Sequence, residues 1–225
     1  MERRITRTVK AGNVEIGSGS KITVQSMLNV LAHDIEGNVA QAVELEKAGC
    51  EIVRLTVPDI EAVKTLYAVK NAVKIPVVAD IHFDYKCALE SVAAGVDKIR
   101  INPGNIGSDD RIKAVADACR QKNIPIRIGV NSGSLEKDLL KKYGHVTPEA
   151  LCESALRHAS LLEKFDFNDI VISIKSSDVR LWLRLTGLLP SSAIIRFISA
   201  LRRQERGIWV CSNPPQVSVR FCLTE

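Results

Sequence analysis

Basic side chains recur inside short apolar runs of this chain. Three of the runs carry one arginine each, at Arg54, Arg100 and Arg127, and a fourth ends on Lys175. A charged side chain is costly to bury inside a strand unless it has a partner. Arginine forks fit phosphate oxygens in a bidentate manner. If these four cations converge, they would therefore form an anion-binding site suited to a phosphorylated small molecule.

Further polar residues occupy the same faces of these runs. Side chains alternate between the two faces of a strand, so residues two apart share a face. This periodicity groups Asp80 with His82, Arg100 with Asn102, Arg127 with Gly129 and Asn131, and Ser173 with Lys175. His82 could act as a general acid or as a phosphate donor. The polar residues that we predict beside the four cations are Asp80, His82, Asn102 and Asn131.

A purely structural role for the same residues is the competing interpretation. The arginines could pair with local carboxylates such as Asp80 and only stabilise the fold. A lone histidine such as His82 is more often structural than functional. The set of cations with few acidic residues nearby favours a binding site. Because no Ser-His-Asp order, H-E-x-x-H pair or Walker A loop is found, we predict no catalytic side chain and no metal ligand.

The elements that would position these residues repeat six times between residues 1 and 179. Each repeat has a β-branched run, a polar turn and an amphipathic helical stretch. The predicted strands are 21–26, 51–57, 75–81, 97–102, 124–131 and 169–175, and the helices include 38–49, 60–72, 86–95, 110–122 and one that opens at Thr147 and Pro148. Such alternation predicts a parallel sheet with helical crossovers.

We interpret this α/β pattern as an incomplete TIM (β/α)8 barrel. A doubly wound open sheet is the alternative, but the first strand lacks the G-x-G-x-x-G of its dinucleotide-binding form. A complete barrel needs eight strands, and six are recognisable. Barrels place their sites at the carboxyl ends of the strands, where four of these strands carry their polar residues. The loops 102–107 and 129–134 contain glycines whose N–H groups could approach a phosphate.

The composition is that of an ordinary globular protein, with 46% hydrophobic and 25% charged residues among 225. No apolar run of about 18 residues is found, which argues against a membrane span. The six cysteines are scattered without a C-x-x-C pair, a pattern typical of free thiols in the cytoplasm. Residues 180–225 hold seven arginines and two glutamates and so carry the whole net charge of +5. We therefore expect no nucleic-acid partner.

Several motifs resemble the 4-hydroxy-3-methylbut-2-enyl diphosphate synthase family of isoprenoid biosynthesis. They are "VQSM" (24–27), "VADIHFDY" (78–85), "RINPGNIG" (100–107), "IPIRIGVNSGSLEKDLL" (124–140) and "IKSSD" (174–178). The resemblance covers roughly residues 3–179. It implies an N-terminal barrel that binds 2-C-methyl-D-erythritol 2,4-cyclodiphosphate, and an oxidoreductase of the non-mevalonate (MEP) pathway that opens this ring reductively. It also implies a C-terminal 4Fe-4S domain, ferredoxin or flavodoxin as electron donor, and a homodimer in which each cluster caps the other barrel.

The resemblance also implies roles for individual residues. The residues that match the family's diphosphate-binding cations are Arg54, Arg100, Arg127 and Lys175, and those that match polar positions around them are Asp80, His82, Asn102 and Asn131. One departure is "SMLNV" (26–30), where the family usually has "SMTNT". Leu28 and Val30 therefore remove two hydroxyl groups from a loop at the barrel mouth.

Beyond Val179 the sequence no longer resembles the family. Residues 180–225 contain both tryptophans, and plausible codons for this segment, regrouped one nucleotide earlier, encode family-like sequence. We interpret 1–179 as the substrate-binding part of the barrel and 180–225 as an out-of-frame tail after a one-nucleotide deletion. We therefore expect the 4Fe-4S domain and its ligands to be absent from the chain, and the chain to be inactive alone. We also expect unpaired edges on the first and sixth strands, and a stray amphipathic helix in "AIIRFISAL" (193–201).

Two other functions remain open on the sequence. A barrel enzyme of the dihydropteroate synthase type could act on a phosphorylated or pterin-like ligand, and binding of a pterin rather than the cyclodiphosphate would identify it. A non-catalytic anion-binding module is the second alternative. It would be a folded, soluble protein with its tail docked.

Overall fold

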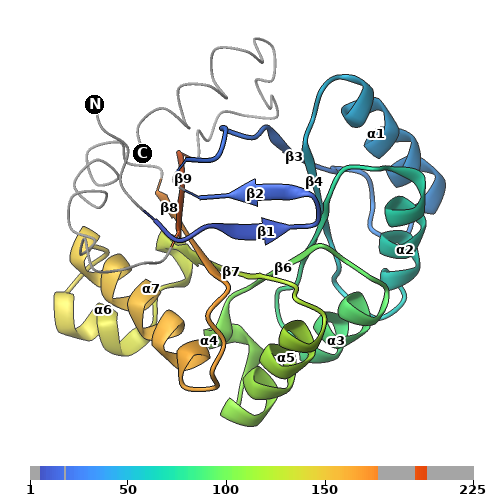
Figure 1. Cartoon of the computed structure of the whole chain (residues 1–225). Helices are drawn as coiled ribbons and strands as arrows, with labels where there is room; N and C mark the ends of the chain where they lie inside the picture. Colours follow the sequence, from blue (N-terminus) through green and yellow to red (C-terminus); the bar gives the residue numbers. More distant parts are fainter. Residues whose placement is uncertain (1–5, 18, 177–195, 202–225) are drawn as a thin grey trace.

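The computed structural model describes residues 6–17, 19–176 and 196–201 (Figure 1). The strands are β1 (Val9–Ala11), β2 (Val14–Ile16), β3 (Gln25–Met27), β4 (Ile52–Thr56), β5 (Val77–Asp80), β6 (Lys98–Ile101), β7 (Ile126–Asn131), β8 (Ile170–Ser176) and β9 (Arg196–Leu201). The helices are α1 (Ile35–Lys47), α2 (Val63–Ala72), α3 (Tyr85–Ala93), α4 (Pro103–Ile106), α5 (Asp109–Gln121), α6 (Lys137–Tyr143) and α7 (Pro148–Glu163), with a 3-10 turn η1 (Ser132–Ser134).

Strands β3 to β9 form one parallel sheet in sequence order. Figure 1 shows α1, α2, α3, α5 and α7 in an arc around the outside of this curved sheet. The six predicted strands are all present, and their ends differ from the prediction by at most four residues, the largest difference being at the start of β3. The fold is a partly closed TIM-type barrel, as the strand–helix alternation predicted. Among the described residues, no helix is both long and apolar enough to cross a bilayer.

The strand residues divide between two hydrophobic clusters according to their alternation. The larger cluster lies between sheet and helices and includes Leu55, Ala79, Ile99 and Ile128. The residues of the opposite parity point into the barrel. There Ile52 and Val78 form a small second cluster with the N-terminal hairpin, and Arg54 and Asp80 occupy the positions two further along the same strands. The alternation therefore separates an apolar outer core from a polar interior.

The β1–β2 hairpin closes the amino-terminal end of the barrel, and the sequence analysis missed it. Ala11 and Ile16 pack on Ile52 and Val78, at the starts of β4 and β5. Its turn requires glycine at position 12 for two reasons. Gly12 has φ +56°, and a Cβ there would lie 2.8 Å from Asp97 Oδ1. A Gly-Asn pair between two short apolar runs is a hairpin signal, and it was available in the sequence.

The expectation of an unpaired sixth strand was wrong. Strand β8 pairs along its length with β9, from Val171 opposite Arg196 to Ser176 opposite Leu201. The helix expected over 193–201 is also wrong for 196–201, which form this strand. Phenylalanine and isoleucine, both present in β9, have high β propensity, and an exposed strand edge is a template for pairing. Within the described residues, β3 and β9 are the two edges of the sheet. The rest of the predicted tail lies outside the described residues.

Local helix signals were read correctly from the sequence. Thr147 caps α7, with its Oγ1 accepting the Ala150 N–H at 3.1 Å. Gly49 and Gly95 follow α1 and α3 with φ of +91° and +82°. These left-handed conformations favour glycine and end the helices. The strand that follows each of them begins within three residues, which fixes the register of the site residues.

Candidate anion-binding site

Three strands place charged side chains side by side in the barrel interior. Asp80 pairs in register with Arg100, and Arg100 pairs in register with Arg127. Arg54 lies on the neighbouring strand β4, with its Nε 3.6 Å from Asp80 Oδ2. The sequence prediction that the three arginines converge is confirmed. They meet at the inner face of β4 to β7 rather than beneath the outer helices.

Asp80 is the shared counter-ion of this cluster. Its Oδ1 lies 3.0 Å from Arg100 Nη1, and both side chains are nearly enclosed. The structural interpretation therefore holds for Asp80, which pairs with two of the arginines. One carboxylate opposite three guanidinium groups still leaves two positive charges in this group of four. Such an excess in a buried place is costly without an anion.

Arg127 is the most enclosed member of the cluster. Its Nε donates to Ser173 Oγ at 3.0 Å, and the Ser173 hydroxyl donates in turn to the Ile128 carbonyl at 3.3 Å. Burial, followed by repulsion from Arg54 and Arg100, lowers the pKa of Arg127 to about 9, although Asp80 opposes the shift. The side chain is 3% exposed. An arginine with a depressed pKa is one whose charge lacks compensation.

Arg54 has hydrogen-bonding capacity to spare. Its Nη2 donates to the Met27 thioether at 2.7 Å, a weak acceptor. Its buried Nε has no hydrogen-bond partner among the described residues. Burial is the largest effect on the pKa of Arg54 and lowers it, and Asp80 raises it. An anion at this place would supply the acceptor that the guanidinium lacks.

Gly129 makes room for Arg100. A Cβ on Gly129 would lie 2.3 Å from Arg100 Nε and 2.6 Å from its Nη2. No real contact is that short, so the guanidinium crosses β7 only because this position has no side chain. Arg100 Nη2 lies 3.4 Å from the Gly129 carbonyl oxygen. The sequence analysis placed Gly129 on the site face but did not see this function.

The other predicted residues are less closely joined to the arginines. Asn102 is buried directly after β6, and its Oδ1 accepts the Gly104 N–H at 3.2 Å. That N–H is therefore used within the loop, against the expectation that it could reach a phosphate. Asn131 ends β7 opposite Lys175 on β8. The Lys175 side chain lies outside what the structure describes.

His82 follows β5 and is half-buried. Its ring centroid is 6.2 Å from that of Phe83, whose side chain is exposed. Within the described part of the chain, His82 has no hydrogen bond or ion pair with the three arginines. The sequence analysis placed Ser173 on the site face without predicting its bond to Arg127, and it missed Met27. Both occupy positions that strand alternation could have identified.

Comparison with known proteins identifies the family. Residues 6–193 match the model of the GcpE TIM-barrel domain. Over 183 residues the chain is 56% identical to the 4-hydroxy-3-methylbut-2-en-1-yl diphosphate synthase (flavodoxin) of Clostridium acetobutylicum, covering 81% of this chain and 52% of that protein. The chain thus spans about half the length of the curated relatives it matches.

Solved structures of low identity share the fold. A type I 3-dehydroquinate dehydratase of Clostridium difficile has a TM-score of 0.64 at 17% identity, covering 86% of this chain and 80% of that one. The dihydropteroate synthase of Xanthomonas albilineans has a TM-score of 0.58 at 16% identity, covering 88% and 77%. Both show a barrel architecture and nothing of the ligand. The sequence match is far stronger, and the chain belongs to the GcpE TIM-barrel family, whose curated members are named 4-hydroxy-3-methylbut-2-en-1-yl diphosphate synthases.

Proposed function

We propose that this barrel binds the diphosphate of 2-C-methyl-D-erythritol 2,4-cyclodiphosphate for reductive conversion to 4-hydroxy-3-methylbut-2-enyl diphosphate. The single observation that carries the proposal is the cluster of three arginines around one carboxylate. A diphosphate would compensate the remaining positive charge and accept a hydrogen bond from Arg54 Nε, which makes none with the described residues. Arginine forks suit phosphoryl oxygens in both charge and geometry.

Each member of the cluster would have a distinct part in binding. Asp80 holds Arg100, and more loosely Arg54, so that their forks are fixed before the ligand arrives. Ser173 orients Arg127 through its Nε, which leaves the terminal nitrogens for an anion. Preorganisation of this kind lowers the entropy cost of binding. Asn102, Asn131, His82 and Lys175 are proposed as further contacts at the strand ends.

The described residues do not fit the 4Fe-4S cluster that the family resemblance implies. Cys50, Cys87, Cys119 and Cys152 are buried free thiols, and no three potential metal ligands come together in the described part of the chain. Burial raises the pKa of Cys119 to about 12, so it is a thiol and not a thiolate ligand. We therefore assign no step of the reaction to a cluster held by these residues.

The complete enzyme would need partners beyond this barrel. The Clostridium relative is named for flavodoxin, and we propose flavodoxin or ferredoxin as the donor and a homodimer as the assembly. Buried reduced cysteines suit the cytoplasm, which we propose as the location. Inactivity of the chain alone stays a prediction, to be measured with a reduced donor and the cyclodiphosphate under anaerobic conditions.

Calorimetric titration of the cyclodiphosphate tests the binding proposal. Arg127→Met should weaken binding about 30-fold or more, since losing one partner of a buried charge contact costs about 2 kcal/mol or more. Arg120→Met is the matched control, because Arg120 pairs with Asp117 on the exposed face of α5. Equal affinity of the two variants would contradict the proposal. Preferential binding of a pterin would indicate an enzyme of the dihydropteroate synthase type.

A further inference from the structure

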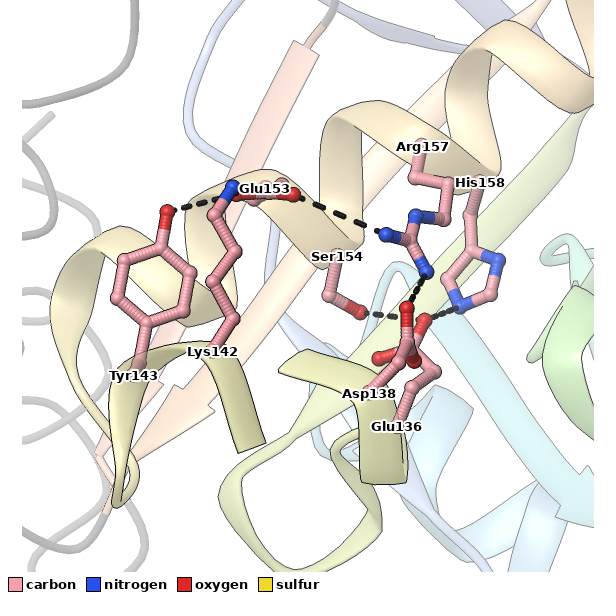
Figure 2. A network of polar contacts seen from close by, with 8 residues as sticks. All are labelled: Glu136, Asp138, Lys142, Tyr143, Glu153, Ser154, Arg157 and His158. Carbon is pink, nitrogen blue, oxygen red and sulfur yellow. Dashed lines mark hydrogen bonds and ion pairs between the residues drawn. The ribbon is translucent and has the colours of Figure 1, made fainter. Parts of the chain in front are cut away.

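A second polar cluster lies between α7 and the segment that follows β7 (Figure 2). His158 Nε2 is 2.8 Å from Glu136 Oε1, and Ser154 Oγ donates to the same oxygen at 3.0 Å. The His158 side chain is 7% exposed and that of Glu136 is 21% exposed. Glu136 Oε2 is buried and has no hydrogen-bond partner among the described residues. Burying a carboxylate oxygen without a hydrogen bond costs free energy, so the contacts with His158 and Ser154 must hold Glu136 in place.

His158 also contacts the loop that follows β6, at the single-turn helix α4 within it. A Cβ on Gly104 would lie 3.1 Å from His158 Cε1 and 3.4 Å from Asn102 Oδ1. The imidazole ring therefore packs directly against Gly104, and only glycine fits there without displacement. This contact uses a ring carbon and is independent of the bond to Glu136. One side chain of α7 thus touches the loop after β6 and the segment after β7.

Both segments contain residues of the proposed diphosphate site. Asn102 directly follows β6 and receives the Gly104 N–H. Asn131 ends β7, five residues before Glu136. A movement of either segment would therefore displace a side-chain amide at the end of a strand. Because α7 packs on β7 and β8, His158 is fixed relative to the strands that carry Arg127 and Ser173.

The surroundings of His158 favour its neutral form. Burial is the largest effect on the pKa of His158, and with Arg157 it outweighs Glu136, so the pKa is lowered. The neutral ring then donates one Nε2–H to Glu136. The charged groups that face His158 are Glu136 from the segment after β7 and Arg157 from α7 itself. The contact from the loop after β6 is uncharged.

A second group of contacts joins α6 to α7 at the protein surface and does not extend to the loop after β6. Arg157 pairs with Asp138 at 2.6 Å, and Glu153 accepts from Lys142 and Tyr143 (Figure 2). Asp138 is 62% exposed, and these pairs join α6 to α7 on the surface. They hold the helices together without contact to the loop after β6. Asp138 therefore offers a matched control for a purely structural effect.

We propose that Glu136 and His158 are positioning residues, which lock the loops after β6 and β7 so that Asn102 and Asn131 meet the diphosphate. This inference rests on the proposed function, because it concerns the same ligand. The pair does not touch the ligand itself. It acts from behind the two loops, through Gly104 on one side and the backbone from Asn131 to Glu136 on the other.

Titration of the full chain with the cyclodiphosphate, together with hydrogen exchange of the loop amides, tests the proposal. His158→Leu should raise Kd about tenfold, because it removes the bond to Glu136 and leaves a buried carboxylate with fewer partners. Exchange in residues 104–107 and 132–136 should quicken. His158→Gln, which retains an N–H near the Nε2 position, should restore most of the affinity. Asp138→Asn should leave both the affinity and the loop exchange unchanged.

The outcomes separate this inference from the proposed function. If the unaltered chain fails to bind the cyclodiphosphate, the proposed function is wrong and the inference falls with it. If that chain binds and His158→Leu binds equally well, only the positioning role is overturned. The same holds if Asp138→Asn weakens binding as much as His158→Leu does. Should His158→Leu fail to fold, Glu136→Gln decides, and unchanged Kd and loop exchange in that variant would overturn the role.

Discussion

At the scale of single residues, the unusual feature is a shortage of negative charge. Arg54 and Arg100 share Asp80 as their counter-ion, and the other side-chain partners of the three arginines are the neutral Met27 and Ser173. An ion-pair network built only for stability would balance its charges. The uncompensated positive charge is better explained by binding of an anionic ligand.

The depressed pKa of Arg127 predicts how binding depends on pH. Below about pH 9 the guanidinium is charged, and above that it loses its proton in the folded protein before it would in the unfolded chain. Protein stability should therefore rise with pH above 9, whereas affinity for the cyclodiphosphate should fall. Near pH 9, binding should take up a proton. Calorimetry in two buffers of different ionisation enthalpy measures this uptake. Equal affinity at pH 7.5 and pH 10, with no proton uptake, would contradict the assignment.

The space above Gly129 supplies a second residue-scale prediction. Gly129→Ala would push Arg100 out of the place where it pairs with Asp80. We expect Kd for the cyclodiphosphate to rise at least tenfold and stability to fall by about 1–3 kcal/mol, the usual cost of overpacking. Gly133→Ala is the control, since a Cβ there would meet nothing within 4 Å. Calorimetry and urea unfolding measure the two effects, and identical behaviour of both variants would refute the argument.

Strand alternation predicted the shared face of Asp80, Arg100 and Arg127, because the parity of a strand fixes the face of each side chain. It could not predict that Arg100 crosses β7 over Gly129, or that Arg54 donates to Met27. Those contacts depend on the stagger between strands and on rotamers, which no pattern in one strand records. His158 and Glu136 were missed for a related reason, since they come from different units of the barrel.

At the scale of elements, two parts of the fold were not predicted from the sequence: the β1–β2 hairpin, which forms the floor of the barrel, and strand β9. The hairpin β1–β2 seals Ile52 and Val78 from water, two residues below Arg54 and Asp80 on the same strands. Capping, glycine and apolar periodicity predicted the six central strands and five of the helices, with ends that differ by up to four residues. Strand β9 was not predicted, because the structure of a short apolar run depends on whether a neighbouring strand edge pairs with it.

The hairpin turn predicts a stability effect that is separate from binding. Gly12→Ala adds a Cβ 2.8 Å from Asp97 Oδ1 and 3.3 Å from Pro76, at a residue with φ +56°. We expect a loss of about 2 kcal/mol or more from strain and displacement combined. Gly19→Ala isolates the backbone strain, because Gly19 also has a positive φ but open space around it. In urea unfolding Gly12→Ala should be the less stable variant, and the reverse order would be inconsistent with a packed floor.

At the scale of the whole molecule, the segment that follows Val179 differs from the rest of the chain in charge. The sequence analysis expected the family resemblance to end at Val179, but the match to the GcpE TIM-barrel domain extends to residue 193. All of the net charge still lies in residues 180–225. The one-nucleotide deletion after Val179 stays a prediction. Sequencing the gene should show family-like codons in the adjacent frame beyond that residue, and unrelated codons there would disprove it.

In the proposed site, three arginines in the barrel interior bind a doubly phosphorylated small molecule. A crystal structure of the full chain soaked with 2-C-methyl-D-erythritol 2,4-cyclodiphosphate tests it most directly. We expect phosphate oxygens at about 2.7–3.0 Å from the Arg54, Arg100 and Arg127 guanidinium groups, with Asp80 still paired to Arg100. A ligand bound elsewhere, or arginines that keep only their present partners in the soaked crystal, would contradict it.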